Sequence, residues 1–162
     1  MMEIRREEPS DVDAIRALVE AAFPTKAEAS LVDALREAND AVVSAVAVEN
    51  GTVLGHAMLS KMSGPFPIVG LAPVAVLPAW QRQSIGSRVV ASALSLARES
   101  GWNGVFVLGA PAFYERFGFS VDLARGFQSP YAGPHFMVLA LNGPLPTRNG
   151  RVDYAPAFAQ FG

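Results

Sequence analysis

The amino-acid sequence predicts a single domain of the α/β (α+β) class, built around a mixed sheet. Two β-rich runs, residues 41–48 and 53–61, flank Asn50-Gly51, a dipeptide typical of tight hairpins between antiparallel strands. Farther along, an apolar run, an amphipathic helix and a second apolar run form a β-α-β unit, whose strands are parallel. The 162 residues, 51% of them hydrophobic, suffice for one well-buried domain, 1–162, and are few for two.

The N-terminal part of the chain predicts a strand followed by two helices. Residues 3–7 form a short strand, and segment 9–13 opens a helix with Ser10 and Asp13 as its capping pair. A second helix is expected over about 27–38, because its apolar residues recur on one side. The hairpin described above then follows.

The β-α-β unit comprises a strand over residues 68–77, a helix over about 85–100 and a strand over 105–108. Apolar residues recur in the helix at four-residue spacing, and Gly101 is placed as its C-terminal stop. The four apolar positions are Ile85, Val89, Ala93 and Ala97.

Pro73 lies inside the first strand of this unit. Proline has no N–H group, so within a sheet it marks an edge or a bulge, and here we expect a bulge. A bulge would splay the strand away from its parallel partner. The backbone groups of Val74 and Val76 would then be free to pair with a ligand.

The C-terminal third predicts shorter elements. Residues 111–117 form a short helix closed by Gly118, residues 119–123 resume a strand, and residues 135–141 form the last strand. The tail from Asn142 is rich in proline and glycine, so it is expected to pack along the surface. Its anchors would be Tyr154, Phe158 and Phe161.

Composition excludes several functional classes. A formal net charge of −2 and a pI near 5.7 argue against a nucleic-acid partner, which needs clustered Lys and Arg. The chain has no cysteine, which excludes disulfides, thiolate metal sites and cysteine nucleophiles. No metal site is expected. No membrane contact is expected either, since no window reaches the length of apolar sequence that a membrane span needs. We therefore expect a cytoplasmic protein.

The segment that joins the first strand of the β-α-β unit to its helix predicts an anion site. The strand ends at Pro78, and residues 81–87 lead directly into the helix. Free N–H groups at a helix start, with the positive end of the helix dipole, suit a phosphate. The same turn carries Arg82, and Gly86 allows a ligand to approach closely.

Residues 74–87 resemble the acyl-CoA signature of the GNAT N-acetyltransferase superfamily. The family form, Gln/Arg-x-x-Gly-x-Gly/Ala, falls on Gln81, Ser84 and Gly86, with serine in place of the middle glycine. Residues 113–119 resemble the second family signature, an aromatic-Tyr pair followed by Gly-Phe. The order of elements is also that of the family. The resemblance implies a mostly antiparallel sheet with a central splayed parallel strand pair and helices on both faces.

The resemblance further implies acetyl-CoA (coenzyme A) as the cofactor. The pyrophosphate would lie on the amides of residues 81–87, and the pantetheine would pair with Val74 and Val76 as an added strand would. Ser84 adds a side chain, but serine is also a good helix N-cap, and its hydroxyl could donate to a phosphate. The implied cofactor-binding residues are Val74, Ala75, Val76, Gln81, Arg82, Gln83, Ser84, Ile85, Gly86, Ser87, Gly109, Phe113 and Tyr114.

The implied reaction is direct attack of a primary amine on the thioester of acetyl-CoA. Tyr114 is the candidate acid for the leaving thiolate, with help from the start of a short helix or a shared hydrogen bond. Many family members place a Glu on the splayed strand, but residues 70–76 contain no carboxylate. The base could be a water relayed through backbone carbonyls, or it could be His56 itself. An amine that arrives neutral needs no base.

Two other functions stay open. The serine at position 84 and the missing carboxylate allow a catalytically weak or inactive acyl-CoA-binding regulatory module, and a non-enzymatic interaction domain is the third reading. The acceptor is not identified by the sequence. Loops 23–29, 62–67 and 125–135 are expected to shape its pocket, with Arg125, Phe127 and Tyr131 as lining residues. The chain could be a monomer or a homodimer.

Overall fold

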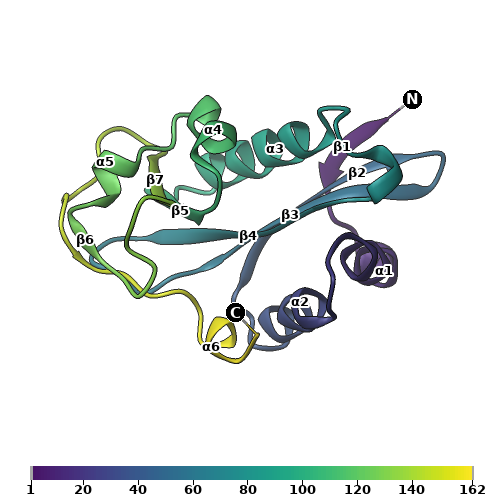
Figure 1. Cartoon of the computed structure of the whole chain (residues 1–162), viewed down its shortest axis with the longest axis horizontal. Helices are drawn as coiled ribbons and strands as arrows, with labels where there is room; N and C mark the ends of the chain where they lie inside the picture. Colours follow the sequence, from purple (N-terminus) through teal and green to yellow (C-terminus); the bar gives the residue numbers. More distant parts are fainter. Residues whose placement is uncertain (1, 162) are drawn as a thin grey trace.

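A twisted six-stranded sheet runs through the molecule with helices on both of its faces (Figure 1). The structure is a computed structural model that describes residues 2–161, apart from the side chain of Phe161. The strand order is β1-β2-β3-β4-β5-β7, and each neighbouring pair is antiparallel except β4 and β5, which are parallel. The strands are β1 Glu3–Arg6, β2 Ala41–Glu49, β3 Thr52–Lys61, β4 Ile68–Val76, β5 Gly104–Leu108 and β7 Phe136–Ala140.

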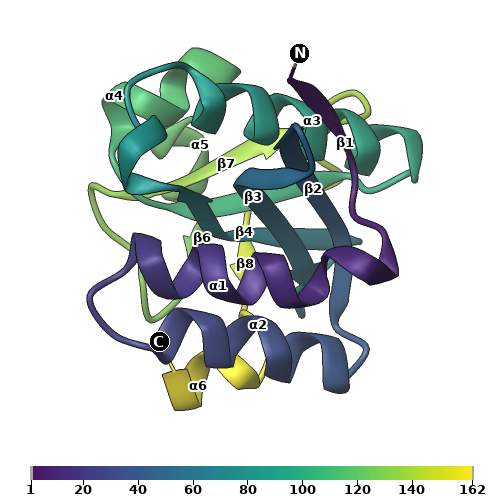
Figure 2. The ribbon, with the colours of Figure 1, turned by 90° about the vertical axis from the view of Figure 1, so that its right-hand side faces the viewer.

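The helices form two layers, one on each face of the sheet. Figure 1 shows α3 (Ile85–Glu99) and α4 (Pro111–Tyr114) on one face, with α1 (Val12–Ala22), α2 (Ala27–Glu37) and α6 (Ala157–Phe161) on the other. Figure 2 shows α1 and α2 side by side beneath the strands. The mostly antiparallel sheet with a parallel pair and helices on both faces confirms the predicted fold class.

Apolar side chains at helical spacing fasten α3 to the sheet. The four residues predicted from the spacing, Ile85, Val89, Ala93 and Ala97, are all buried against strands β2 to β5. A buried aliphatic side chain contributes about 1.5–3 kcal/mol relative to an exposed one. This packing holds the first turn of α3 at the end of β4.

The hairpin between β2 and β3 forms as predicted. Asn50 and Gly51 both have positive φ, +51° and +76°. A two-residue turn of this kind matches the twist of the flanking strands, and Asn-Gly tolerates the left-handed backbone that it needs.

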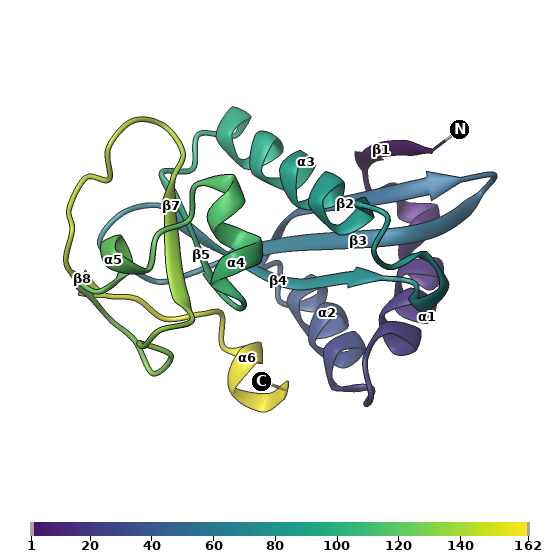
Figure 3. The same ribbon diagram turned by 45° about the horizontal axis from the view of Figure 1, so that its top comes forward.

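Strand β4 carries the predicted bulge. Ala57 pairs with Val74 and Leu59 pairs with Leu71, so Ala72 and Pro73 together face a single residue of β3. Pairing between β4 and β5 is limited to three positions and ends where Gly70 faces Phe106. Beyond that point β4 and β5 diverge, as Figure 3 shows, and β4 continues, paired with β3 only, to the turn that leads into α3.

Two predicted details of local structure were wrong. The capping pair at the first helix is Glu8 and Asp11, because a short 3₁₀ turn (Pro9–Asp11) precedes α1 and the Glu8 amide donates to the Asp11 carboxylate (2.7 Å). Residues 119–123 do not continue as a strand. Ser120 makes one bridge to Val138 and then caps a helical turn, α5 (Val121–Ala124), by accepting from the Leu123 amide (3.0 Å).

The tail packs along the surface but contains more structure than predicted. Its strand β8 (Gly150–Arg151) pairs in parallel with β6 (Phe127–Gln128), and α6 packs on α2. Tyr154 and Phe158 pack as expected, whereas the prediction for Phe161 falls outside the described side chains. Among residues 2–161, no helix combines the length and apolar character of a membrane span.

Candidate active site

The divergence of β4 from β5 leaves one edge of β4 without a protein strand. The Leu77 amide donates to the Leu54 carbonyl of β3 (2.9 Å), and backbone groups of alternate residues point to opposite edges of a strand. Val76 and Val74 therefore point toward the gap. The Val76 carbonyl accepts a hydrogen bond from the Gln81 side chain (3.2 Å), so this one group of the predicted edge is already bonded.

A groove of about 300 Å³ begins at this edge and covers the start of α3. It brings together eight of the thirteen residues predicted for the cofactor: Val76, Gln81, Arg82, Ser84, Ile85, Gly86, Ser87 and Phe113. Trp80 and Arg116 also line it, and neither was among the predicted binding residues.

The other five predicted residues do not line this groove: Val74, Ala75, Gln83, Gly109 and Tyr114. Ala75 is buried on the opposite face of the sheet, against α1. Val74 lies farther along the open edge, toward Pro73. Gly109 and Tyr114 lie together beside the groove, next to Phe113.

The electrostatics of the groove suit an anion. Arg82 and Arg116 line it, and none of its described lining residues is acidic. The first turn of the 15-residue helix α3 adds unpaired N–H groups and the positive end of the helix dipole. Such a site binds phosphate groups through backbone donors and two guanidinium groups together.

The backbone of the turn is held in an uncommon conformation. Arg82 and Ser84 have positive φ, +67° and +65°, in a region that costs a residue with a side chain about 1–3 kcal/mol. Ser84 precedes α3, but its hydroxyl caps no helix amide, so its expected role as a side-chain N-cap is wrong. The family signature has glycine at this position, and the positive φ explains that preference.

Gly86 leaves open space over the first turn of α3. A Cβ atom built there would lie 3.6 Å from Val76 Cγ2 and 3.9 Å from Phe113 Cζ, which are ordinary contacts. Its φ is not among the positive values, so neither packing nor backbone conformation of the protein itself requires glycine. The cradle therefore fits a ligand that approaches the helix backbone closely.

Arg116 is held over the groove by three contacts. Its guanidinium donates to the Ser87 hydroxyl (2.9 Å) and to the Phe113 carbonyl (3.2 Å), and it lies 4.6 Å from the centre of the Phe113 ring. A cation over an aromatic face is attracted to it. The sequence places Arg116 inside the second signature, but only the fold shows that it reaches α3.

Tyr114 packs between the groove and the second parallel strand. A Cβ at Gly109 would lie 2.5 Å from Tyr114 Cε2, so glycine at 109 makes room for this ring. Phe113 and Phe119 contact it edge to face. Burial raises the pKa of Tyr114 above its usual value. The expected help is missing within residues 2–161, because Tyr114 ends α4 rather than starting it and no side-chain hydrogen bond involves its hydroxyl.

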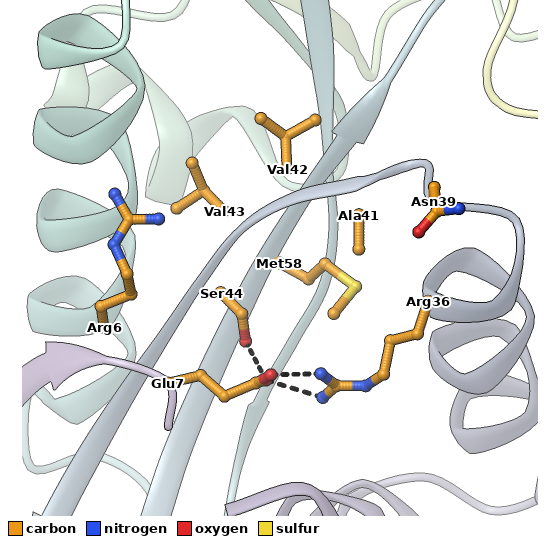
Figure 4. Close-up of a pocket in the computed structure, with 9 residues that line it drawn as sticks. All are labelled: Arg6, Glu7, Arg36, Asn39, Ala41, Val42, Val43, Ser44 and Met58. Atoms are coloured by element: carbon orange, nitrogen blue, oxygen red, sulfur yellow. Dashed lines mark hydrogen bonds and ion pairs between the residues drawn. The ribbon is translucent and has the colours of Figure 1, made fainter. Parts of the chain in front are cut away.

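His56 lies in a separate hydrogen-bond network, of which Figure 4 shows Glu7, Arg36 and Ser44. Glu7 accepts hydrogen bonds from Arg36 and from the Ser44 hydroxyl (2.5 Å), and Ser44 Oγ lies 2.8 Å from His56 Nε2. Burial lowers the pKa of His56 to about 4, and the side chain has no exposed surface. An imidazole without exposed surface cannot contact an amine, so His56 cannot take its proton directly.

Comparison with known proteins gives consistent matches. The sequence pattern of the family described as "Acetyltransferase (GNAT) family" matches residues 12–119. The uncharacterized N-acetyltransferase YhbS of Escherichia coli (strain K12) is 33% identical over 171 aligned residues, which cover 99% of this chain and 100% of that protein.

Two solved structures match over nearly their whole length. A crystal structure of the E. coli GNAT family N-acetyltransferase YhbS in complex with CoA has a TM-score of 0.88 and 32% identity, covering 99% of this chain and 93% of that one. A GNAT family acetyltransferase from Brucella melitensis in complex with acetyl-CoA has a TM-score of 0.81 and 36% identity, covering 98% of both chains.

Proposed function

This chain belongs to the GNAT acetyltransferase family, and we propose that it transfers an acetyl group from acetyl-CoA to a primary amine of an acceptor. The observation that carries the proposal is the groove at the start of α3, which joins an anion site to the unpaired edge of β4. Coenzyme A has both parts that such a groove would recognise, a phosphate-bearing end and an arm with two amides. The crystallised relatives bind CoA and acetyl-CoA.

The residues of the groove fit these two parts. Arg82, Arg116 and the first amides of α3 would hold the phosphates, and the space over Gly86 would let them approach the helix. The amides of the arm would pair with Val74 and Val76, as an added strand pairs with a sheet edge. The Gln81 side chain would move from the Val76 carbonyl to make room.

In the proposed reaction the amine nitrogen attacks the thioester carbonyl carbon. A C–N bond forms, the C–S bond breaks, the amine gives up one proton and the sulfur takes one. Tyr114 is the proposed donor to the sulfur, and its raised pKa keeps it protonated at neutral pH. Donation from a tyrosine to a thiolate is uphill by at least about 2 kcal/mol from the reference pKa values, which slows the step without preventing it.

Neither β4 nor His56 offers an acceptor for the proton of the amine. Residues 70–76 carry no carboxylate, and His56 is buried in its own network. The proposal therefore requires an amine that arrives uncharged, or one that loses its proton to water. The reaction is proposed to occur in the cytoplasm, as the cysteine-free sequence allows, with the chain as a monomer or a homodimer.

A second candidate function is an acyl-CoA-binding regulatory module with little or no turnover. It is favoured by Ser84, whose side chain occupies a position of positive φ in the phosphate turn, and by the missing carboxylate on β4. Both functions share the binding site. They differ in whether acetyl groups leave the thioester when an amine is supplied.

Isothermal calorimetry against acetyl-CoA, with free coenzyme A and ATP as controls, tests the binding site. The expected result is binding of both coenzyme forms in preference to ATP, lost in Gly86→Glu, which places a carboxylate against the phosphates while the fold stays intact. Absence of binding would overturn the proposed function. Binding without release of coenzyme A across a broad set of primary amines would favour the regulatory module instead.

A further inference from the structure

A second cavity lies where β4 and β5 diverge. It measures about 180 Å³ and is lined by Leu71, Ala72, Leu108, Tyr131, Tyr154 and Phe158. Leu71 and Ala72 directly follow the last residue of β4 that pairs with β5, and Leu108 is the last residue of β5. The cavity therefore opens onto the gap between the two strands.

This cavity is on the sheet face opposite α3. Ala72, Tyr154 and Phe158 pack in the same cluster as the buried residues of α2, and Figure 1 shows α2 and α6 across the sheet from α3. Val76 lines the groove at α3, and Ala72 lines the cavity four residues away, about 13 Å along the strand. If the proposed function holds, the arm of acetyl-CoA runs along this edge from the groove, and its acetyl group reaches the cavity.

The lining of the cavity is apolar and uncharged. Of its described residues, none is Asp, Glu, Lys, Arg or His, and the only polar side-chain atoms are the hydroxyls of Tyr131 and Tyr154. These two rings meet edge to face, with centroids 5.4 Å apart. An apolar cavity of roughly 150 Å³ holds a benzene molecule, so this one has room for a ring of that size.

An ammonium group would be poorly accommodated there. Moving a charge from water to an apolar site without a counterion is unfavourable, and none of the described residues that line the cavity carries a carboxylate to compensate it. An amine that is already neutral avoids this penalty. Weakly basic amines, in which the nitrogen is attached directly to an aromatic ring, are neutral at physiological pH.

Tyr154 supplies an unused polar group. Its ring packs on the backbone of Gly70, where a Cβ would lie 2.5 Å from Tyr154 Cε1, so it is fixed at the last paired position of β4. Its hydroxyl oxygen is buried and has no hydrogen-bond partner among the described groups. Leaving such a group unpaired is unfavourable, and a polar atom of a bound acceptor would offset that cost.

We propose that this cavity is the acceptor site and that its substrate is an arylamine, a neutral amine carried on an apolar ring. The nitrogen lone pair attacks the thioester carbon without prior deprotonation. The nitrogen loses its proton to water after the C–N bond forms, the C–S bond breaks, and the sulfur leaves with a proton from Tyr114. The loops predicted to shape this pocket contribute Tyr131, whereas Phe127 is buried in the core and Arg125 pairs with Asp122 at the surface.

Aniline and benzylamine form the matched pair of probes. They differ by one methylene, but benzylamine is charged at pH 7 and aniline is not, and ethanolamine serves as a small polar control. Release of coenzyme A is followed with a thiol reagent, to which this cysteine-free chain contributes no background. The expected kcat/KM for aniline exceeds those of benzylamine and ethanolamine. A higher value for benzylamine, which aromatic faces could attract as a cation, would overturn the proposal.

Leu108→Asp and Leu108→Asn separate charge from shape. Leu108 is 46% exposed, so both variants keep the fold, and they differ only in the charge placed at the cavity. Leu108→Asp is expected to shift the ratio of kcat/KM for benzylamine over aniline upward by about tenfold relative to Leu108→Asn, as a counterion would. Equal ratios in the two variants would place the acceptor elsewhere.

Tyr154→Phe tests the unpaired hydroxyl. It removes a hydroxyl that has no partner among the described groups, so the melting temperature is expected to hold or rise, while KM for aniline increases and acetyl-CoA affinity is unchanged. An unchanged KM would remove the hydroxyl from the site. Saturation-transfer NMR of aniline with the protein alone measures aniline binding independently of acetyl-CoA. Absence of aniline binding overturns this inference, whereas failure of acetyl-CoA to bind in calorimetry overturns the proposed function.

Discussion

Gly86→Ala is expected to make the protein more stable and a weaker binder of acetyl-CoA. The added Cβ would lie 3.6 Å and 3.9 Å from its nearest neighbours, which needs no rearrangement. Alanine in a helix is favoured over glycine by up to about 1 kcal/mol, so a gain of about 0.5–1 kcal/mol is expected near the helix start. For a chain of this size that gain raises the melting temperature by about 1–4 °C.

The same methyl group occupies the space through which phosphates would approach the amides of α3. Overpacking a well-fitted site by one carbon costs about 1–3 kcal/mol, which corresponds to about 5-fold to 150-fold in affinity. Thermal melting and calorimetry with acetyl-CoA measure the two effects on the same sample. Ser95→Ala, on the exposed side of α3, is the control that gains helix propensity without touching the groove. Unchanged affinity in Gly86→Ala would refute the close approach of a ligand to this turn.

Two further substitutions test the site, and a third tests the buried histidine. Arg116→Ala should weaken acetyl-CoA binding about tenfold in calorimetry through loss of a charge-assisted contact, while Arg125→Ala, at a surface ion pair, should not. Tyr114→Phe should lower kcat far more than it changes the KM for acetyl-CoA, and equal turnover would remove Tyr114 as the acid. His56 is neutral in the folded protein with a pKa of about 4, so the unfolded chain binds this proton first as the pH falls. Stability should therefore drop by about 3 kcal/mol between pH 6.5 and 4, and denaturant titrations of His56→Gln should show a shallower pH slope.

Local sequence signals predicted the parts of the fold that local physics decides. Asn50-Gly51 adopts the positive φ values that a tight hairpin needs, and Pro73 marks the bulge because proline has no N–H to give to a ladder. The predicted strand over 119–123 does not form, because Ser120, with one bridge to Val138, serves as a helix N-cap. Strands β6 and β8 were not predicted, because each has only two residues and pairs with a distant segment.

The part of the groove that local sequence forms was also predictable. Its backbone donors and Gly86 belong to one continuous strand-turn-helix segment, so spacing alone places them together. Arg116 could not be placed, because its reach to Ser87 depends on how α4 packs on α3. The acceptor cavity is harder still. Leu108 and Tyr154 are far apart in sequence and meet only through the path of the tail beneath the sheet.

The missing carboxylate on β4 and the apolar character of the cavity have a common explanation. A site that accepts charged amines needs a carboxylate or imidazole near the thioester, whereas residues 70–76 offer none and His56 is buried with its pKa lowered. An uncharged cavity at the same place would bind an ammonium ion poorly. An acceptor that is neutral before it binds makes both features consistent with turnover, so the missing base does not by itself favour an inactive protein. A rate for aniline that does not rise between pH 6.5 and 8.5, beside a rate for benzylamine that does, would distinguish this account from one in which water deprotonates a bound ammonium ion before the attack.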